Sequence, residues 1–266
     1  MDFDRHLTSG TTFSIFILID IGFVQSSSDR CLYLRSDGSM AWIYVDDIIV
    51  AGPNDTTLDQ IQQGLGEAVS ITTSEESSII GINIERSKIG IFMNQPGYID
   101  NILERFGFDG CHPRQIPMNP KCKPKKCSEG DPIFHDQKKY ASAIGCLLYL
   151  ANTTRPDILH STTVMCQFVA FPSMEHWNSV AEIIRYLSGT KTFGLFFPSH
   201  ESRELLPTFI GYTDSDHAQC TDTKISKSGI VGMIESSVAA SISRKQGGVS
   251  YSTLQSESYA LAEGAR

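Results

Sequence analysis

The chain has 266 residues, which is long enough for two compact units, because single domains commonly hold about 100–150 residues. Hydrophobic residues make up 41% and charged residues 20%, as in an ordinary globular protein, which excludes a disordered tail, a collagen-like fibre and a membrane bundle. The net charge is −8, from 22 Lys and Arg against 30 Asp and Glu, so any nucleic-acid binding must depend on local patches or metal ions.

The compartment follows from three further features of the sequence. The longest apolar run, Phe13 to Ile19, ends at Asp20 and is far shorter than the roughly 20 residues of a membrane span. Asp2 and Asp4 do not fit the basic start of a secretion signal. Seven cysteines, an odd number, indicate free thiols in a reducing compartment and no disulfide framework. We therefore expect an intracellular protein, cytoplasmic or nuclear, with no membrane partner.

In the first hundred residues, apolar spacing and turn dipeptides predict alternating helices and strands. Two apolar runs flank Asp46-Asp47, which predicts a hairpin with both carboxylates at its tip. We expect this hairpin at the edge of a sheet shared with the strands over 31–34 and 79–85. The other elements predicted here are the end of a helix within 13–23, a helix over 56–69, and a second hairpin formed by 79–85 and 88–93.

Beyond Gly97 the apolar pattern changes to helical spacing. Between the helices, the stretch 112–139 is rich in proline and holds seven Lys and Arg against three Asp and Glu, which predicts an extended basic linker. The predicted helices cover 98–106, 140–151, 156–170 and 173–188, followed by strands over 193–197, 209–213, 229–234 and 238–243 and a helix from 255 onward.

The sharpest chemical feature is the acidic pair Asp46-Asp47 between two apolar runs. Two adjacent ionised carboxylates repel each other, and a divalent cation removes that cost. Mg²⁺ prefers hard oxygen ligands and uses one or two carboxylates together with substrate phosphates. The pair therefore suits metal-dependent nucleotidyl transfer, although the dipeptide by itself also fits a solvated turn.

A second acidic group follows the strand predicted over 209–213. Asp214 and Asp216 are two positions apart and so share one face of the extended chain. Glu257 lies about forty residues later, where a helix is predicted. An Asp on a strand and a Glu on a packed helix can share a metal ion, but such a pair is common and carries little weight alone.

Other motifs are weaker. Lys121, Lys123, Lys125 and Lys126 fit phosphate contacts, which need charge and no particular sequence, and they fit a solvated loop equally well. A zinc site on cysteines 111, 122 and 127 with histidines 112 and 135 lacks a Cys-x-x-Cys pair, so a loose linker is favoured. No serine-hydrolase elbow, P-loop or dinucleotide-binding glycine motif is present.

Taken together, these motifs resemble one family. Tyr44-Val45-Asp46-Asp47 with the following Ile48 to Gly52 resembles the polymerase motif of reverse transcriptases from copia-type long-terminal-repeat retrotransposon polyproteins. Resemblance covers nearly the whole chain from about Gly22. The other matching segments follow in the family's order at 21–33, 80–84, 95–99, 103–106, 140–145, 154–158, 175–177, 185–190, 211–216, 226–229 and 252–257.

The resemblance implies an α+β fold in three parts: a reverse-transcriptase palm remnant (1–105), a helical thumb and connection with the basic linker (106–200), and a truncated ribonuclease H-like α/β unit (205–266). It implies that Asp46, Asp47, Asp214 and Glu257 are catalytic and ligate Mg²⁺ or Mn²⁺, and leaves Asp216 outside the ligand set. The implied partners are an RNA template, a DNA primer, an RNA–DNA hybrid and deoxynucleoside triphosphates.

The sequence also departs from the family pattern. The third palm carboxylate, the fingers and the last two ribonuclease H carboxylates have no counterpart, and His217, Gln219 and Ile225 replace the residues that are usual there. We therefore expect a piece or decayed copy that is inactive as this chain. The alternative is a domesticated, non-catalytic module that binds nucleic acid or another partner.

Overall fold

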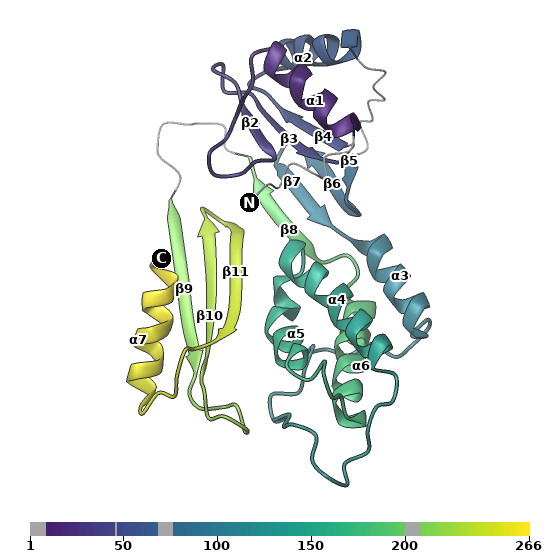
Figure 1. Cartoon of the computed structure of the whole chain (residues 1–266), viewed down its shortest axis with the longest axis vertical. Helices are drawn as coiled ribbons and strands as arrows, with labels where there is room; N and C mark the ends of the chain where they lie inside the picture. Colours follow the sequence, from purple (N-terminus) through teal and green to yellow (C-terminus); the bar gives the residue numbers. More distant parts are fainter. Residues whose placement is uncertain (1–8, 46, 69–76, 200–207) are drawn as a thin grey trace. The chain divides into compact units, whose positions relative to one another are not determined.

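The structure is a computed structural model and describes residues 9–45, 47–68, 77–199 and 208–266 (Figure 1). It has a mixed α/β architecture and divides into two compact units, Met1–Glu75 and Glu76–Arg266. Within the described ranges, no helix has the length and apolar content needed to cross a bilayer. All seven cysteines lie in these ranges, and each is a free thiol.

The first unit is a four-stranded antiparallel sheet, in the order β1-β2-β3-β4, packed against two helices. Ala41 and Ile43 alternate with more exposed neighbours along β3, so one face of the sheet is buried. This face packs against Leu18 of α1 and against Ile61 and Leu65 of α2. The elements are α1 (Ser9–Asp20), β1 (Val24–Gln25), β2 (Leu32–Leu34), β3 (Met40–Tyr44), β4 (Asp47–Ala51) and α2 (Asp55–Ala68).

The second unit contains a four-stranded sheet, in the order β5-β6-β7-β8, and a group of helices around an apolar core. Helix α3 has Pro96 in its first turn and ends at Gly107, whose φ of 78° is the left-handed conformation that glycine adopts readily. The elements are β5 (Ser77–Ile79), β6 (Ile82–Ser87), β7 (Gly90–Asn94), α3 (Pro96–Phe106), α4 (Gln137–Thr153), the 3₁₀ turn η1 (Pro156–Ile158), α5 (Leu159–Cys166), α6 (Met174–Gly189) and β8 (Gly194–Pro198).

The structure corrects two expectations about the strand predicted over 79–85. It is broken at Ile80 and Gly81, which both have positive φ and form the turn between β5 and β6. The strand also does not join the sheet of the acidic hairpin, because β6 pairs with β5 and β7, and β7 pairs with β8. The β7–β8 pairing joins residues far apart in the sequence, such as Asn94 and Gly194, and a local apolar pattern does not reveal such a partner.

The last part of the second unit is a three-stranded antiparallel sheet, in the order β11-β10-β9, that packs against one helix (Figure 1). Ser252 caps this helix by accepting a hydrogen bond from the backbone amide of Gln255. The elements are β9 (Phe209–Asp216), β10 (Lys227–Ile234), β11 (Ser237–Lys245) and α7 (Thr253–Gly264). The division into palm, connection and ribonuclease H modules stays a prediction.

Candidate metal and nucleic-acid sites

The β3–β4 hairpin carries the acidic dipeptide. Tyr44 pairs with Asp47 across the turn, and the predicted position of Asp46 lies outside the described residues. Val45 has a φ of 54°, the conformation that tight two-residue hairpin turns require but that β-branched residues rarely adopt. The hairpin predicted from the sequence is confirmed, and Asp47 is the first residue of β4.

The hairpin is anchored by one face, and Val45 next to Tyr44 is exposed. Ala41 and Ile43 are buried in the core, whereas Trp42 and Tyr44 stack on the opposite face with ring centroids 5.7 Å apart. Asp47 is exposed, and its carboxylate has no hydrogen-bond or ion-pair partner among the described residues. An exposed carboxylate on a hairpin that packs on the core by its other face is available to a metal ion.

Asp214 on β9 and Glu257 on α7 are both exposed. These two elements contact each other, but through other residues. Ser215 of β9 donates a hydrogen bond from Oγ to Ser256 Oγ of α7, at 2.9 Å. Adjacent strand residues point to opposite faces, so Asp214 lies on the face of the sheet away from α7. The described contacts therefore do not join Asp214 to Glu257, and a shared ion stays a prediction.

The Asp214 face of this sheet is the face that α5 contacts. Asp214, Gly229 and Ser243 are directly opposite one another across the three strands and share that face. Ser243 Oγ lies 3.2 Å from Thr163 Oγ1 and 3.5 Å from His160 Nδ1, both on α5. Because Gly229 has no side chain, the surface beside the Asp214 carboxylate stays open.

Two more ionisable residues, Asp216 and Lys227, lie along the same face. Asp216 Oδ1 accepts a hydrogen bond from the backbone amide of Lys227, and burial raises the pKa of the Asp216 carboxyl. Lys227 is only 7% exposed, and its Nζ has no hydrogen-bond partner among the described residues. Burial lowers the pKa of this ammonium to about 8. Asp216 and Lys227 are thus partly desolvated neighbours of Asp214, and sequence reasoning singled out Asp216 but not Lys227.

The four lysines predicted to contact phosphates lie in a segment, residues 121–126, that runs between α3 and α4 without helical structure. The side chains of all four are exposed, and none forms an ion pair with a described residue: Lys121, Lys123, Lys125 and Lys126. The segment is extended, as predicted, but it is not loose, because its backbone bonds to other elements. The lysine segment is therefore an ordered cationic surface.

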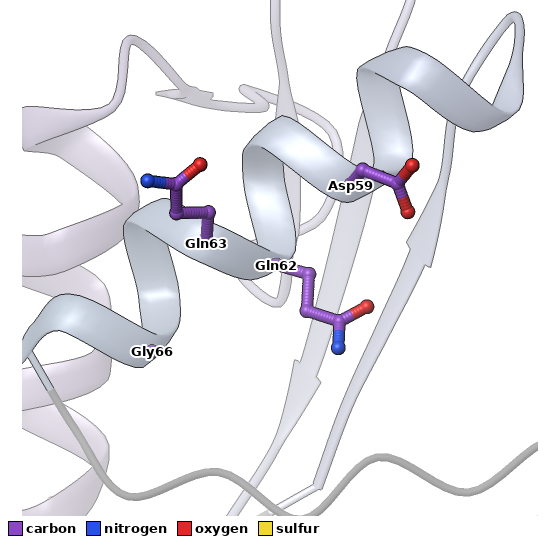
Figure 2. Close-up of a pocket in the computed structure, with 4 residues that line it drawn as sticks. All are labelled: Asp59, Gln62, Gln63 and Gly66. Atoms are coloured by element: carbon purple, nitrogen blue, oxygen red, sulfur yellow. The ribbon is translucent and has the colours of Figure 1, made fainter.

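The rest of the described chain offers no stronger site. It contains no group of three or more His, Cys, Asp or Glu side chains placed to hold a metal ion. A pocket on α2 is lined by Asp59, Gln62, Gln63 and Gly66 (Figure 2). All four belong to a single helix, and the pocket is open to solvent, so it does not enclose a ligand.

The class of protein follows from comparison with known families. Residues 10–120, which include the acidic hairpin, match the family described as reverse transcriptase (RNA-dependent DNA polymerase). No solved structure matches the chain.

The curated relatives extend the similarity over most of the chain. It is 32% identical over 249 residues to the retrovirus-related Pol polyprotein from transposon RE1 of Arabidopsis thaliana, a match that covers 92% of this chain and 16% of that protein. It is 29% identical over 256 residues to the Pol polyprotein from transposon TNT 1-94 of Nicotiana tabacum, with 91% and 19% covered. Over most of its length the chain is therefore similar to retrovirus-related Pol polyproteins from copia-type transposons, and its first part matches the reverse transcriptase family.

The chain spans less than a fifth of the length of these polyproteins. It also matches an uncharacterized mitochondrial protein of Arabidopsis thaliana, at 29% identity over 221 residues, which are 83% of this chain and 89% of that protein.

Proposed function

We propose that this chain carries part of a reverse transcriptase and the beginning of a ribonuclease H. The observation that supports this most directly is the acidic β3–β4 hairpin within the segment that matches the reverse transcriptase family. Residues 1–105 then correspond to the palm, 106–200 to the thumb and connection, and 205–266 to the ribonuclease H module. The reaction class is phosphoryl transfer on RNA template, DNA primer, deoxynucleoside triphosphate and RNA–DNA hybrid.

The acidic side chains would hold Mg²⁺ or Mn²⁺. Asp46 and Asp47 supply the hard oxygen donors that these ions prefer, and the exposed carboxylate of Asp47, which has no partner among the described residues, fits this role. Asp214 and Glu257 have the same donor chemistry, but the fit is weaker because Asp214 lies on the face away from α7. Bound ions in such sites activate the attacking oxygen and stabilise the leaving one.

The isolated chain should show little or no polymerisation, because each proposed site takes only two carboxylates from it. The test is Mn²⁺ binding, followed by primer extension on an RNA template. Asp47→Asn should weaken Mn²⁺ binding at least tenfold. Asp59→Asn, an equal charge change on exposed α2, should leave it unchanged. Equal effects of the two variants would refute the metal site. Robust extension that Asp47→Asn abolishes would refute the expected inactivity.

The exposed lysine segment favours a second candidate, a module that binds nucleic acid without catalysis. Its four lysines, which form no ion pair with a described residue, can neutralise phosphates without any metal ion. Binding of an RNA–DNA hybrid that persists in EDTA and in the Asp47→Asn and Asp214→Asn variants would favour this candidate. Binding that disappears in all three cases would favour the metal-dependent function.

A further inference from the structure

We infer that His176 and Thr221 are positioning residues that anchor the lysine segment from two sides and hold its four lysines in place for a nucleic-acid backbone. This inference rests on the proposed binding of nucleic acid by the lysine segment. It adds the two residues that would set the geometry of that surface.

The first anchor is His176 at the start of α6. Its Nδ1 accepts a hydrogen bond from the Ser173 backbone amide at 3.0 Å, while Ser173 Oγ accepts one from the His176 amide, so the two form a capping box. Because Nδ1 is an acceptor, the neutral ring carries its proton on Nε2. Nε2 lies 2.9 Å from the Lys125 carbonyl oxygen and therefore donates to it. The ring is 1% exposed and stacks on Phe168, with centroids 4.0 Å apart.

The second anchor is the loop between β9 and β10. Thr221 Oγ1 donates to the Pro124 carbonyl oxygen at 3.0 Å, and Asp222 Oδ2 accepts from the Lys126 backbone amide at 2.9 Å. Three consecutive residues of the segment, 124–126, are thus held through their main chain. The lysine side chains take no part in these bonds and stay exposed.

In this arrangement, the residues that hold the lysine segment in place are not the residues that would contact the phosphates. A flexible lysine loop loses conformational entropy when it binds a polyanion, whereas a loop whose backbone is already anchored loses less. Phosphate contacts require charge at a suitable spacing, and a fixed backbone sets that spacing. His176 and Thr221 should therefore affect affinity without contributing any charge.

The experiment uses the full chain and a 20-base-pair RNA–DNA hybrid of mixed sequence. His176→Phe keeps the stacked ring but removes both ring nitrogens, and Thr221→Val removes one hydroxyl from a partly exposed site. Each variant removes one hydrogen bond to the segment, and His176→Phe also removes the bond from the Ser173 amide to Nδ1. Each should raise amide exchange across residues 121–126 and weaken hybrid binding about threefold to tenfold, the effect of losing the one bond to the segment. His176→Gln, with an amide donor and acceptor, should restore much of both.

Two controls make the result specific. Thr223→Val is the matched control, because the Thr223 hydroxyl bonds to Cys220 and not to the segment, and it should change neither measurement. The slope of log affinity against log salt should stay the same in the anchor variants. In the double variant Lys121→Gln/Lys123→Gln, the slope should become shallower by about 0.9 for each phosphate that is no longer neutralised.

The outcomes are distinguishable. Unchanged amide exchange in both His176→Phe and Thr221→Val would overturn the anchoring. Raised exchange with unchanged affinity, in a chain whose lysines do bind the hybrid, would overturn the positioning role. If the lysine variants bind as tightly as the natural chain, the proposed binding of nucleic acid by this segment fails, and the recognition part of this inference fails with it. The exchange data still decide separately whether the two anchors hold the segment.

Discussion

Replacement of Arg155 should destabilise the second unit more than removal of a surface ion pair does. The guanidinium is 1% exposed and forms a two-pronged pair with Asp157, with Nε–Oδ1 at 2.9 Å and Nη2–Oδ2 at 2.7 Å. It also donates to the Thr190 carbonyl oxygen and Oγ1, at 2.9 and 2.7 Å. The rings of Tyr186 and Phe193 each lie 5.6 Å from its central carbon. This network joins η1 to the end of α6.

The size of the effect follows from what Arg155→Met leaves behind. Breaking a buried ion pair by removing one partner costs about 3–5 kcal/mol. Asp157 retains the hydroxyl of Tyr186 at 2.8 Å, and its side chain is 34% exposed, so part of its charge stays solvated. We therefore expect the lower end, about 3 kcal/mol, which lowers the melting temperature of a unit of this size by roughly 6–12 °C.

Thermal unfolding followed by circular dichroism measures this effect. Arg155→Lys should fall between the natural chain and Arg155→Met, because lysine keeps the charge but not the planar fork. The control is Arg114→Met, which removes the exposed pair with Glu182, where Nη2 and Oε1 are 3.0 Å apart. Such a surface pair contributes about 0–1 kcal/mol. Melting temperatures of Arg155→Met and Arg114→Met within about 2 °C of each other would refute the reasoning, because the expected effect is several times larger.

Two further predictions concern pH. Burial lowers the pKa of His176, so the unfolded chain binds more protons, and stability present above the ordinary pKa of 6.5 should be lost as pH falls below it. His176→Gln should reduce this loss in melts between pH 8 and 5, and an identical pH dependence would contradict the assignment. Burial lowers the pKa of Lys227 to about 8 from 10.5, so stability should rise with pH across that window. Lys227→Met should be more stable at pH 7 and lack the rise. A less stable variant at pH 7 would show that the ammonium is compensated by its surroundings.

Local sequence determined the elements wherever one repeating pattern dominated. Two apolar runs around an acidic pair predicted the β3–β4 hairpin, and the structure confirms it, because a two-residue turn leaves a single register for the flanking strands. Helix α6, predicted over 173–188, spans Met174–Gly189. The helix predicted over 156–170 is shorter, with η1 followed by α5, which ends at Cys166.

The anchors of the lysine segment could not be predicted from local sequence patterns. His176 bonds to a carbonyl 51 residues earlier, and Thr221 to one 97 residues earlier, so neither bond leaves a trace in the local pattern. The one available signal was Ser173, three residues before His176 at the start of an apolar helix, which is the spacing of a capping box.

Only the tertiary structure decided which helix packs on each face of the sheet formed by β9, β10 and β11. The sequence determined that Asp214 and Asp216 share a face, because side chains alternate along any strand. It did not determine that α7 packs on the opposite face through Ser215 and Ser256, or that α5 reaches the Asp214 face at Ser243. Both faces of β9 carry small and polar residues near its end, so the alternation shows no preferred buried side there. Long-range packing breaks that symmetry and thereby sets which residues surround each carboxylate.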